Sequence, residues 1–238
     1  MKITRTFGLA LVSGLTLLSA CGGTNHDSKQ AKEDYKNSLN DSIEAIKVEI
    51  DSCNSQIEIL REKVNVWLRD FSTVSNPREV APYIIYTPAK DKYPLTSTGV
   101  MARMNDSGQL ELVAALAGNH FDQISVTAGD ESLSSSVVPN DQALNYRTDN
   151  LTTVMFSGQA ADSIANLIAD NELNPVSLSY INGGKPVIAM KLSDFEKKTV
   201  SYTYLLYKNS NELHRLELRV PMLHEKINLI RLHQDKDK

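Results

Sequence analysis

Apolar residues recur near the N-terminus at alternating spacings of four and three. They are Leu39, Ile43, Ile46, Ile50, Cys53, Ile57, Leu60, Val64, Trp67 and Phe71. This heptad pattern is typical of a helix whose apolar seam packs on another helix. Because residues 31–75 contain neither proline nor glycine, we predict one long helix over residues 34–75. The alternative is a lone amphipathic helix on a globular core.

The C-terminal end shows the same spacing. Its apolar residues are Leu213, Leu216, Val220, Leu223, Ile227 and Ile230. The spacing predicts a second helix over residues 193–238, capped by Ser193 or Asp194 with Glu196 in its first turn. Pro221 lies off the seam, so we expect it to kink this helix or to start another one.

The two predicted helices have similar lengths and opposite charge. Residues 29–71 carry seven basic and nine acidic side chains, whereas residues 193–238 carry nine basic and seven acidic ones. We therefore predict that they pair within one molecule as an antiparallel coiled-coil-like stalk, which makes a monomer the favoured state. The alternative is a parallel homodimer through the stalk, in which Cys53 would face its own copy.

Residues 76–192 change to the alternation of period two that is typical of strands. Two β-rich runs flank the turn residues 105–108, and another hairpin is predicted around Gly183-Gly184. The run Tyr83–Tyr86 lies between prolines and predicts a short edge strand. One helix is predicted near residues 159–171, with Ser157 or Gly158 as its cap. The predicted fold is α+β: a mainly antiparallel β domain carrying one helix, inserted between the two long helices.

The first 21 residues have the features of an export signal. Lys2 and Arg5 precede an apolar run over residues 7–18, which is shorter than the roughly 20 residues that span a bilayer. The residues Leu18-Ser19-Ala20-Cys21 resemble the lipobox of bacterial lipoproteins. This resemblance implies that residues 1–20 are a signal peptide and that Cys21 carries the lipid. An ordinary signal peptide with an incidental cysteine is the alternative.

Residues 21–33 are polar and lack periodicity, which predicts a flexible tether next to the lipid. Gly22 stands where an aspartate would resemble an inner-membrane retention signal, so we expect an outer-membrane lipoprotein, with the side of the membrane left open. Beyond the lipobox, the chain loosely resembles uncharacterised envelope lipoproteins of Gram-negative bacteria. That resemblance implies no activity.

The net charge and the number of cysteines limit which functions the chain can have. From residue 21 onward the chain has 23 basic and 29 acidic residues, a net charge of −6, which argues against nucleic acid as a partner. With Cys21 lipidated, only Cys53 remains, so no intrachain disulfide can form. Because Cys53 lies on the apolar seam, we interpret it as a small buried side chain rather than a reactive thiol.

The motifs of common catalytic sites are absent from the sequence, and no catalytic residue is predicted. The five histidines lack metal-ligand spacing, so we expect no metal and no cofactor. Four carboxylates in strands or turns could form a glycosidase-like pair, or could simply keep the surface soluble: Glu111, Asp122, Asp130 and Glu131. Three tyrosines are weak candidates for a sugar-binding platform, or could pack on the sheet: Tyr83, Tyr86 and Tyr93.

These observations favour a non-enzymatic cell-envelope lipoprotein whose helical stalk presents a β-rich binding head. Its expected contacts are the membrane, through the lipid, and an envelope protein or glycan. One alternative is a lipoprotein that binds a small ligand or glycan in a pocket of the head. Another is a hydrolase whose site assembles from scattered residues.

Overall fold

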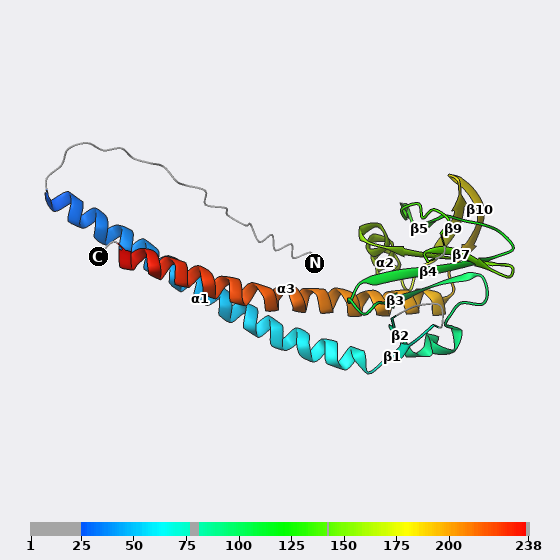
Figure 1. Cartoon of the computed structure of the whole chain (residues 1–238), viewed down its shortest axis with the longest axis horizontal. Helices are drawn as coiled ribbons and strands as arrows, with labels where there is room; N and C mark the ends of the chain where they lie inside the picture. The colour runs from blue at the N-terminus through cyan, green and yellow to red at the C-terminus, as the bar shows by residue number, and fades with distance from the viewer. Residues whose placement is uncertain (1–24, 77–80, 142, 237–238) are drawn as a thin grey trace, which may run out of the picture. The chain divides into compact units, whose positions relative to one another are not determined.

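The computed structural model describes residues 25–76, 81–141 and 143–236. The protein is α+β, with two antiparallel sheets and a long helix at either end of the described chain, and the predicted fold class is confirmed to this extent (Figure 1). The chain divides into two compact units. One contains residues 25–46 and 227–236, and the other contains residues 47–226. The predicted signal peptide and Cys21 lie outside the described residues.

The helices are α1 (Asn25–Leu68), α2 (Gln159–Asp170) and α3 (Asp194–Lys236), with the 3₁₀ helix η1 (Thr87–Lys92). The first strands are β1 (Phe71–Val74), β2 (Tyr83–Tyr86), β3 (Gly99–Met104), β4 (Leu110–Ala117) and β5 (Gln123–Ala128). The remaining strands are β6 (Glu131–Ser134), β7 (Asn145–Thr148), β8 (Leu151–Ser157), β9 (Val176–Asn182) and β10 (Lys185–Lys191).

Helix α1 differs from its prediction at both ends. It already includes residues 25–33, where a flexible tether was predicted. Within this stretch, residues 29–33 (KQAKE) are all strong helix formers, which can extend a helix without an apolar pattern. At the other end α1 stops at Leu68 rather than at residue 75, and Phe71 belongs to β1. The aromatic and β-branched residues of 71–74 favour a strand. The helical spacing of apolar residues therefore extends further along the sequence than the helix does.

The seam residues of α1 and α3 are buried. In the unit of residues 47–226 these are Ile50, Cys53, Ile57, Val64, Leu216 and Leu223. The ion pairs Arg219–Glu49 and Arg61–Glu217 join the two helices in this unit. In the other unit Ile43, Ile46 and Ile227 are buried, and Gln234 donates a hydrogen bond to Asn40 at 2.9 Å. Pro221 lies inside α3 and neither ends it nor starts a second helix.

A capping box starts α3, and Ser193 is the cap. Its hydroxyl accepts a hydrogen bond from the Glu196 backbone N–H at 3.2 Å, and its own backbone N–H donates to Glu196 Oε2 at 2.8 Å. This reciprocal pair satisfies two backbone donors at the helix start. The other oxygen of Glu196 accepts a hydrogen bond from the Val100 N–H at 3.2 Å, which fixes the first turn of α3 to β3.

The strands form two antiparallel sheets. The six-stranded sheet has the order β1-β2-β3-β4-β8-β7, and the four-stranded sheet has the order β10-β9-β5-β6. Both predicted hairpins are present, as β3–β4 and β9–β10. Strand β2 is not an edge strand as predicted, because β1 pairs with its outer side, in the register Phe71↔Tyr86. The helical spacing of the sequence instead predicts residues 71–74, which form β1, as the end of the preceding helix.

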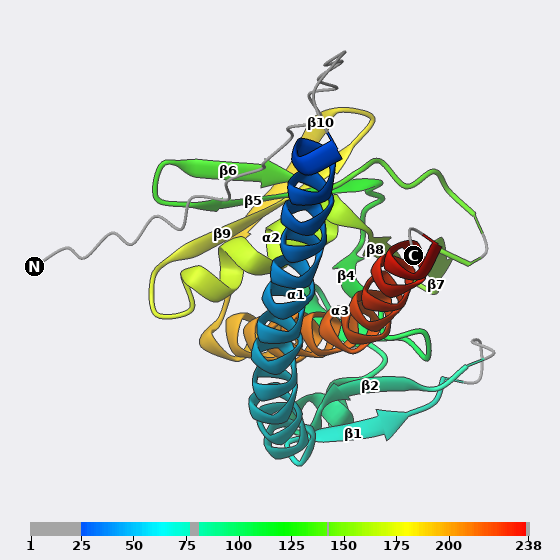
Figure 2. The same ribbon diagram turned by 90° about the vertical axis from the view of Figure 1, so that its left-hand side faces the viewer.

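The main core lies between the two sheets and includes α2 and the start of α3. Inward-pointing residues of both sheets meet there, among them Leu112, Val154, Ile124 and Leu178. Helix α2 lies against β5 and β6 of the four-stranded sheet and against β4 and β8 of the six-stranded sheet, and Figure 2 shows it beside β5. The opposite face of the six-stranded sheet has a separate, smaller cluster, and this outer face carries the candidate site.

Candidate functional site

The outer face of the six-stranded sheet is partly covered by η1 and the loop that follows it. Side chains alternate between the two faces of a strand. Met101 on β3, Val113 on β4 and Met155 on β8 therefore point outward together. Ala89 of η1, with Tyr93 and Leu95 of the following loop, packs on these three side chains. The loop thus lies against the sheet at its middle strands.

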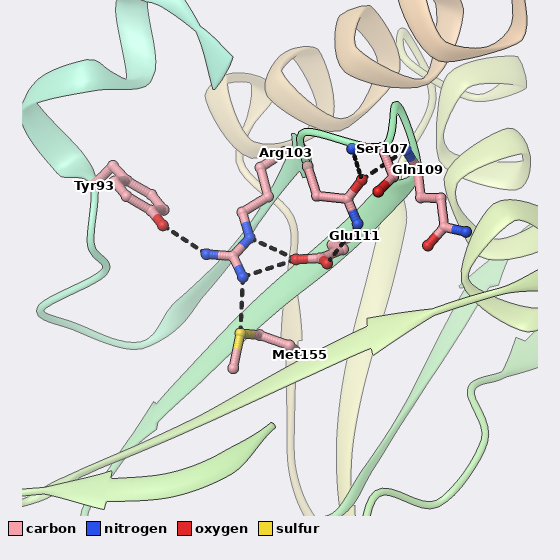
Figure 3. Close-up of polar contacts among 7 residues, drawn as sticks. Tyr93, Arg103, Ser107, Gln109, Glu111 and Met155 are labelled. Carbon is pink, nitrogen blue, oxygen red and sulfur yellow. Dashed lines mark hydrogen bonds and ion pairs between the residues drawn. The ribbon is translucent and has the colours of Figure 1, made fainter. Parts of the chain in front are cut away.

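Arg103 organises one end of this outer face (Figure 3). Its side chain is 2% exposed, and it pairs with Glu111 of β4, whose side chain is 16% exposed. Nε donates to Glu111 Oε2 at 2.8 Å, Nη1 to the Tyr93 hydroxyl at 2.5 Å and Nη2 to the sulfur of Met155 at 2.9 Å. The guanidinium also stacks on Tyr83, 3.5 Å from the ring centroid.

The partners of Arg103 are themselves held in place. Asn105 donates from its side-chain amide to Glu111 Oε1 at 3.2 Å, so both carboxylate oxygens accept hydrogen bonds. The side-chain oxygen Oδ1 of Asn105 accepts hydrogen bonds from the backbone N–H groups of Ser107 and Gln109, at 3.1 and 2.9 Å, and so shapes the β3–β4 turn. This satisfied network stabilises the sheet and the covering loop. Removing one member of such a buried charge pair costs about 3–5 kcal/mol.

A cavity of about 450 Å³ opens at the other end of the outer face. Its floor consists of outward-pointing residues of three neighbouring strands: Ala117, Tyr146, Thr148, Leu151 and Thr153. One wall is the covering loop, with Pro94, Leu95 and Thr96. Asp149 and Asn150, in the turn between β7 and β8, lie at its rim. This volume is in the range of small-ligand pockets, about 300–1,000 Å³.

The turn at the cavity rim is fixed by hydrogen bonds. The Gly118 N–H donates to the Asn150 backbone carbonyl at 2.7 Å, and Arg147 Nη2 donates to the Asn150 side chain at 3.0 Å. Arg147 Nη1 lies 2.8 Å from His120 Nε2. Asp149 adopts a positive φ of 51°, a conformation that asparagine and aspartate tolerate better than most residues. The rim is therefore preformed rather than assembled by a ligand.

The structure brings two of the three predicted tyrosines together. Tyr83 and Tyr93 both contact Arg103. Tyr86 lies three positions after Tyr83 on the same strand and so points to the opposite face. There its ring packs on Phe71 and Tyr202, with centroid distances of 5.8 and 4.9 Å. None of the three lines the cavity, although Tyr93 directly precedes Pro94 in its wall.

The four candidate carboxylates lie in separate environments. Glu111 is paired with Arg103. Asp122 accepts a hydrogen bond from the Gly183 N–H at 3.0 Å. Asp130 is in the turn between β5 and β6, and Glu131 follows it at the start of β6. The structure therefore does not bring these four side chains to one site.

A second, more acidic hollow of about 510 Å³ lies between α2 and β6. Glu131, Asp162 and Asp170 contribute its carboxylates, and Tyr204 contributes an aromatic ring. The Tyr207 hydroxyl donates to Asp162 Oδ2 at 2.8 Å. Burial raises the pKa of the Tyr207 hydroxyl, and the hydrogen bond to Asp162 raises it further. Burial and the charges of Asp162 and Asp170 also raise the pKa of Tyr204.

Within the described part of the chain, no three histidine, cysteine or acidic side chains gather in a way that could hold a metal ion. His120 lies beside Arg147, and the ring of His233 packs edge-on against Tyr35 at a centroid distance of 6.2 Å. His214 and His224 are exposed on α3. No helix in the described ranges contains a stretch long and apolar enough to cross a bilayer.

Comparisons with known proteins assign no family. No family profile and no curated protein sequence matches the chain. A crystal structure described as a novel protein of unknown function from Burkholderia pseudomallei is similar over 67% of this chain and 94% of its own. The two share 10% sequence identity, with a TM-score of 0.24, which is too low to support an argument from fold or function.

Sequence reasoning missed both Arg103 and the cavity. The sequence does contain a pattern that predicts a buried role for Arg103. An arginine within the apolar run GVMARM requires a buried partner. Counting outward from the turn at residues 105–108 places Glu111 opposite Arg103, as the register confirms. The cavity had no such signal, because its walls come from segments that are distant in the sequence.

Proposed function

We propose that this protein is a non-enzymatic cell-envelope lipoprotein whose β-rich region binds a small, neutral, hydroxyl-bearing ligand, of which a glycan is the best fit. The observation that carries the proposal is the preformed cavity on the outer face of the six-stranded sheet. The sequence supports the location, through the apolar N-terminal run and the lipobox-like residues that end at Cys21.

The lining of the cavity favours this class of ligand. Tyr146 offers an aromatic ring, and Pro94 and Leu95 offer apolar surface on which the C–H face of a sugar can stack. Thr148, Thr153 and Asn150 supply hydroxyl and amide groups that can bond to sugar hydroxyls. Among the described lining residues Asp149 carries the one formal charge, so a phosphate or another anion would lack a cationic partner.

The two long helices support a role as a spacer. Their seam residues are buried, and ion pairs join them within the unit of residues 47–226. We propose that they form an antiparallel coiled-coil-like stalk that holds the binding region away from an outer membrane. The separation of the candidate carboxylates supports binding rather than hydrolysis, because glycoside hydrolysis needs two carboxyl groups on either side of one bond.

The test is saccharide binding with the cavity open and blocked. Neutral di- and trisaccharides built from glucose, galactose and N-acetylglucosamine are screened by saturation-transfer NMR, and binders are measured by calorimetry. Leu95→Trp fills the cavity and is expected to weaken binding at least tenfold. The matched control, Leu133→Trp in the hollow beside α2, should bind like the wild type. No binding by any saccharide, or unchanged binding in Leu95→Trp, would overturn the proposal.

A second candidate function is binding of a protein partner at β10. This strand is the edge of the four-stranded sheet, and Val187 and Ile188 expose apolar side chains on it. An open edge strand can accept an extended segment of another protein. Strand addition would depend on the backbone of β10, so Ala189→Pro should abolish it while leaving saccharide binding unchanged.

A further inference from the structure

Both long helices carry exposed apolar side chains on the face opposite their buried seam. In the unit of residues 47–226, Val48 and Ile59 of α1 are 69% and 67% exposed, and Leu218 and Met222 of α3 are 55% and 68% exposed. Each lies two residues from a seam position, which is about 200° around a helix. We call these two surfaces the back faces. The back face of α1 contains Val48 and Ile59, and the back face of α3 contains Leu218 and Met222. Single exposed apolar side chains are common on protein surfaces, but Leu218 and Met222 lie one helical turn apart and so form a continuous apolar patch.

The back face of α3 is hollowed as well as apolar. A depression of about 370 Å³ lies at the edge of this back face, where Leu218 and Met222 adjoin the seam residue Leu223. Arg215, Arg219 and Lys226 surround it. Arg215 pairs with Glu212 and Arg219 with Glu49 of the same molecule, and Lys226 adds a third cation. An apolar side chain flanked by acidic residues would fit this surface.

The back face of α1 has that complementary character. Two exposed acidic residues lie near its apolar side chains. Asp51 comes three residues after Val48, and Glu58 directly precedes Ile59. Ser52 and Ser55, between the two apolar residues, are small and exposed, so another helix can approach closely. The α1 face is thus mainly acidic, with Lys63 beyond Ile59, and the α3 face is mainly basic, with Glu225 beyond Met222.

The two back faces also occur at the same level along the helix pair. The ion pair between Arg219 and Glu49 shows which residues of the antiparallel helices lie side by side. Met222 follows Arg219 by three residues and Val48 precedes Glu49 by one, so they lie within about one helical turn of the same level. A second copy standing beside the first in the same orientation would bring its Val48 opposite Met222 of the first.

We propose that the chain self-associates side by side, with the back face of α3 in one copy packed on the back face of α1 in the next. This contact is heterologous, because the two surfaces differ, so each copy keeps one face open for a further copy and a row or ring results. Neighbouring helices are then antiparallel across the contact, and all copies point the same way. That orientation is compatible with a common N-terminal membrane anchor, although the contact does not depend on one.

Disulfide cross-linking in intact cells expressing the full chain tests this arrangement. The variant Val48→Cys/Met222→Cys is oxidised with copper phenanthroline and run without reductant. It should form a ladder of dimers, trimers and larger species, because each copy carries both halves of the contact. Each single variant should remain monomeric. The control Val48→Cys/His224→Cys moves the second cysteine to an exposed α3 position away from the back face and should give at least fivefold less product.

A second cysteine pair controls for the case in which the first pair has the wrong local geometry for a disulfide. Ser52→Cys/Leu218→Cys lies about one turn away and should give the same ladder, and Lys226→Glu should reduce both ladders several-fold. The absence of a ladder with both pairs overturns the proposal. So does an equally strong dimer from Met222→Cys alone, which would indicate a symmetric contact between α3 helices. Cross-linking of these cysteines to a protein of another mass would show a different partner and would also overturn it.

Discussion

Arg103 and Glu111 face each other directly across the β3–β4 pair, and their side chains form a charge pair with an Nη2–Oε2 distance of 2.7 Å. The same guanidinium holds the hydroxyl of Tyr93, and the next residue, Pro94, is part of the cavity wall. A buried charge tolerates few alternative positions, because leaving its partner is costly. The pair therefore fixes both the strand register and the loop that forms the wall of the proposed binding site.

Replacing Arg103 alone should be strongly destabilising. Arg103→Met leaves Glu111 partly buried without its cation and should lower the free energy of unfolding by about 3–5 kcal/mol. The double variant Arg103→Met/Glu111→Leu removes both charges and should recover much of that loss. Urea unfolding followed by circular dichroism measures both. A double variant as unstable as the sum of the two single changes would show that the charges do not act as a pair.

The sequence was sufficient for the elements with a strong local pattern. The heptad residues Ile50, Cys53 and Leu216 are buried as predicted, and the turn at residues 105–108 joins the predicted hairpin. Ser193 and Glu196 form the predicted capping box. In each case the pattern and the contact lie within a few residues or one helical face, so local physics decides the outcome.

The sequence was insufficient where distant segments compete for the same residues. Phe71 continues the helical spacing, yet it is in a strand because Tyr86 is available to pair with it. The predicted group of three tyrosines depended on proximity in the sequence, whereas strand alternation sends Tyr86 to the opposite face. The cavity is lined by residues of β4, β7, β8 and the loop after η1. No local sequence pattern predicts that these distant segments lie next to one another.

The lipid anchor is tested at Cys21. Cys21→Ser removes the thiol that the lipobox resemblance assigns to acylation, so labelling with a radioactive or alkyne fatty acid should be lost. The mature protein should then move from the membrane fraction to the soluble fraction, since the acyl chains supply the anchor. The wild-type chain is the positive control. A variant that still sediments with membranes after a high-salt wash would contradict the anchor.

Alkaline pH should destabilise the protein through its buried tyrosines. Burial, with a contribution from the charge of Glu196, raises the pKa of the Tyr180 hydroxyl, which donates to the Gly99 carbonyl at 3.1 Å. The folded state therefore holds this proton more tightly than the unfolded state, where tyrosine titrates near pH 10. The resulting stability is fully present below about pH 10 and falls as the pH rises above it.

Urea unfolding at several pH values between 8 and 11 measures this effect. The decline above pH 10 should be shallower in Tyr180→Phe than in the wild type, although the variant is less stable at pH 8 because it lacks the hydrogen bond to Gly99. Lysines also titrate in this range, and the comparison between the two proteins cancels their contribution. Parallel curves would show that Tyr180 does not carry the pH dependence.

Cys53 distinguishes the two arrangements that the heptad seam allows. In a parallel homodimer through the seam, the two copies of Cys53 would face each other, because equivalent core positions pair in that geometry. In an antiparallel pair within one chain, Cys53 faces α3, which contains no cysteine. The side chain is 5% exposed and unpaired with another cysteine in the described residues. Its burial by α3 should make the thiol slow to react.

We expect the chain lacking residues 1–21 to remain free of disulfide-linked dimer after oxidation and to react with iodoacetamide only as it unfolds. The alkylation rate should rise with urea in parallel with the loss of helical circular dichroism. As a matched control, a cysteine introduced at the exposed neighbour Asn54 should be alkylated rapidly in the folded state. Near-complete dimer through Cys53 would instead require the parallel homodimer, and with it a stalk built from two chains rather than one.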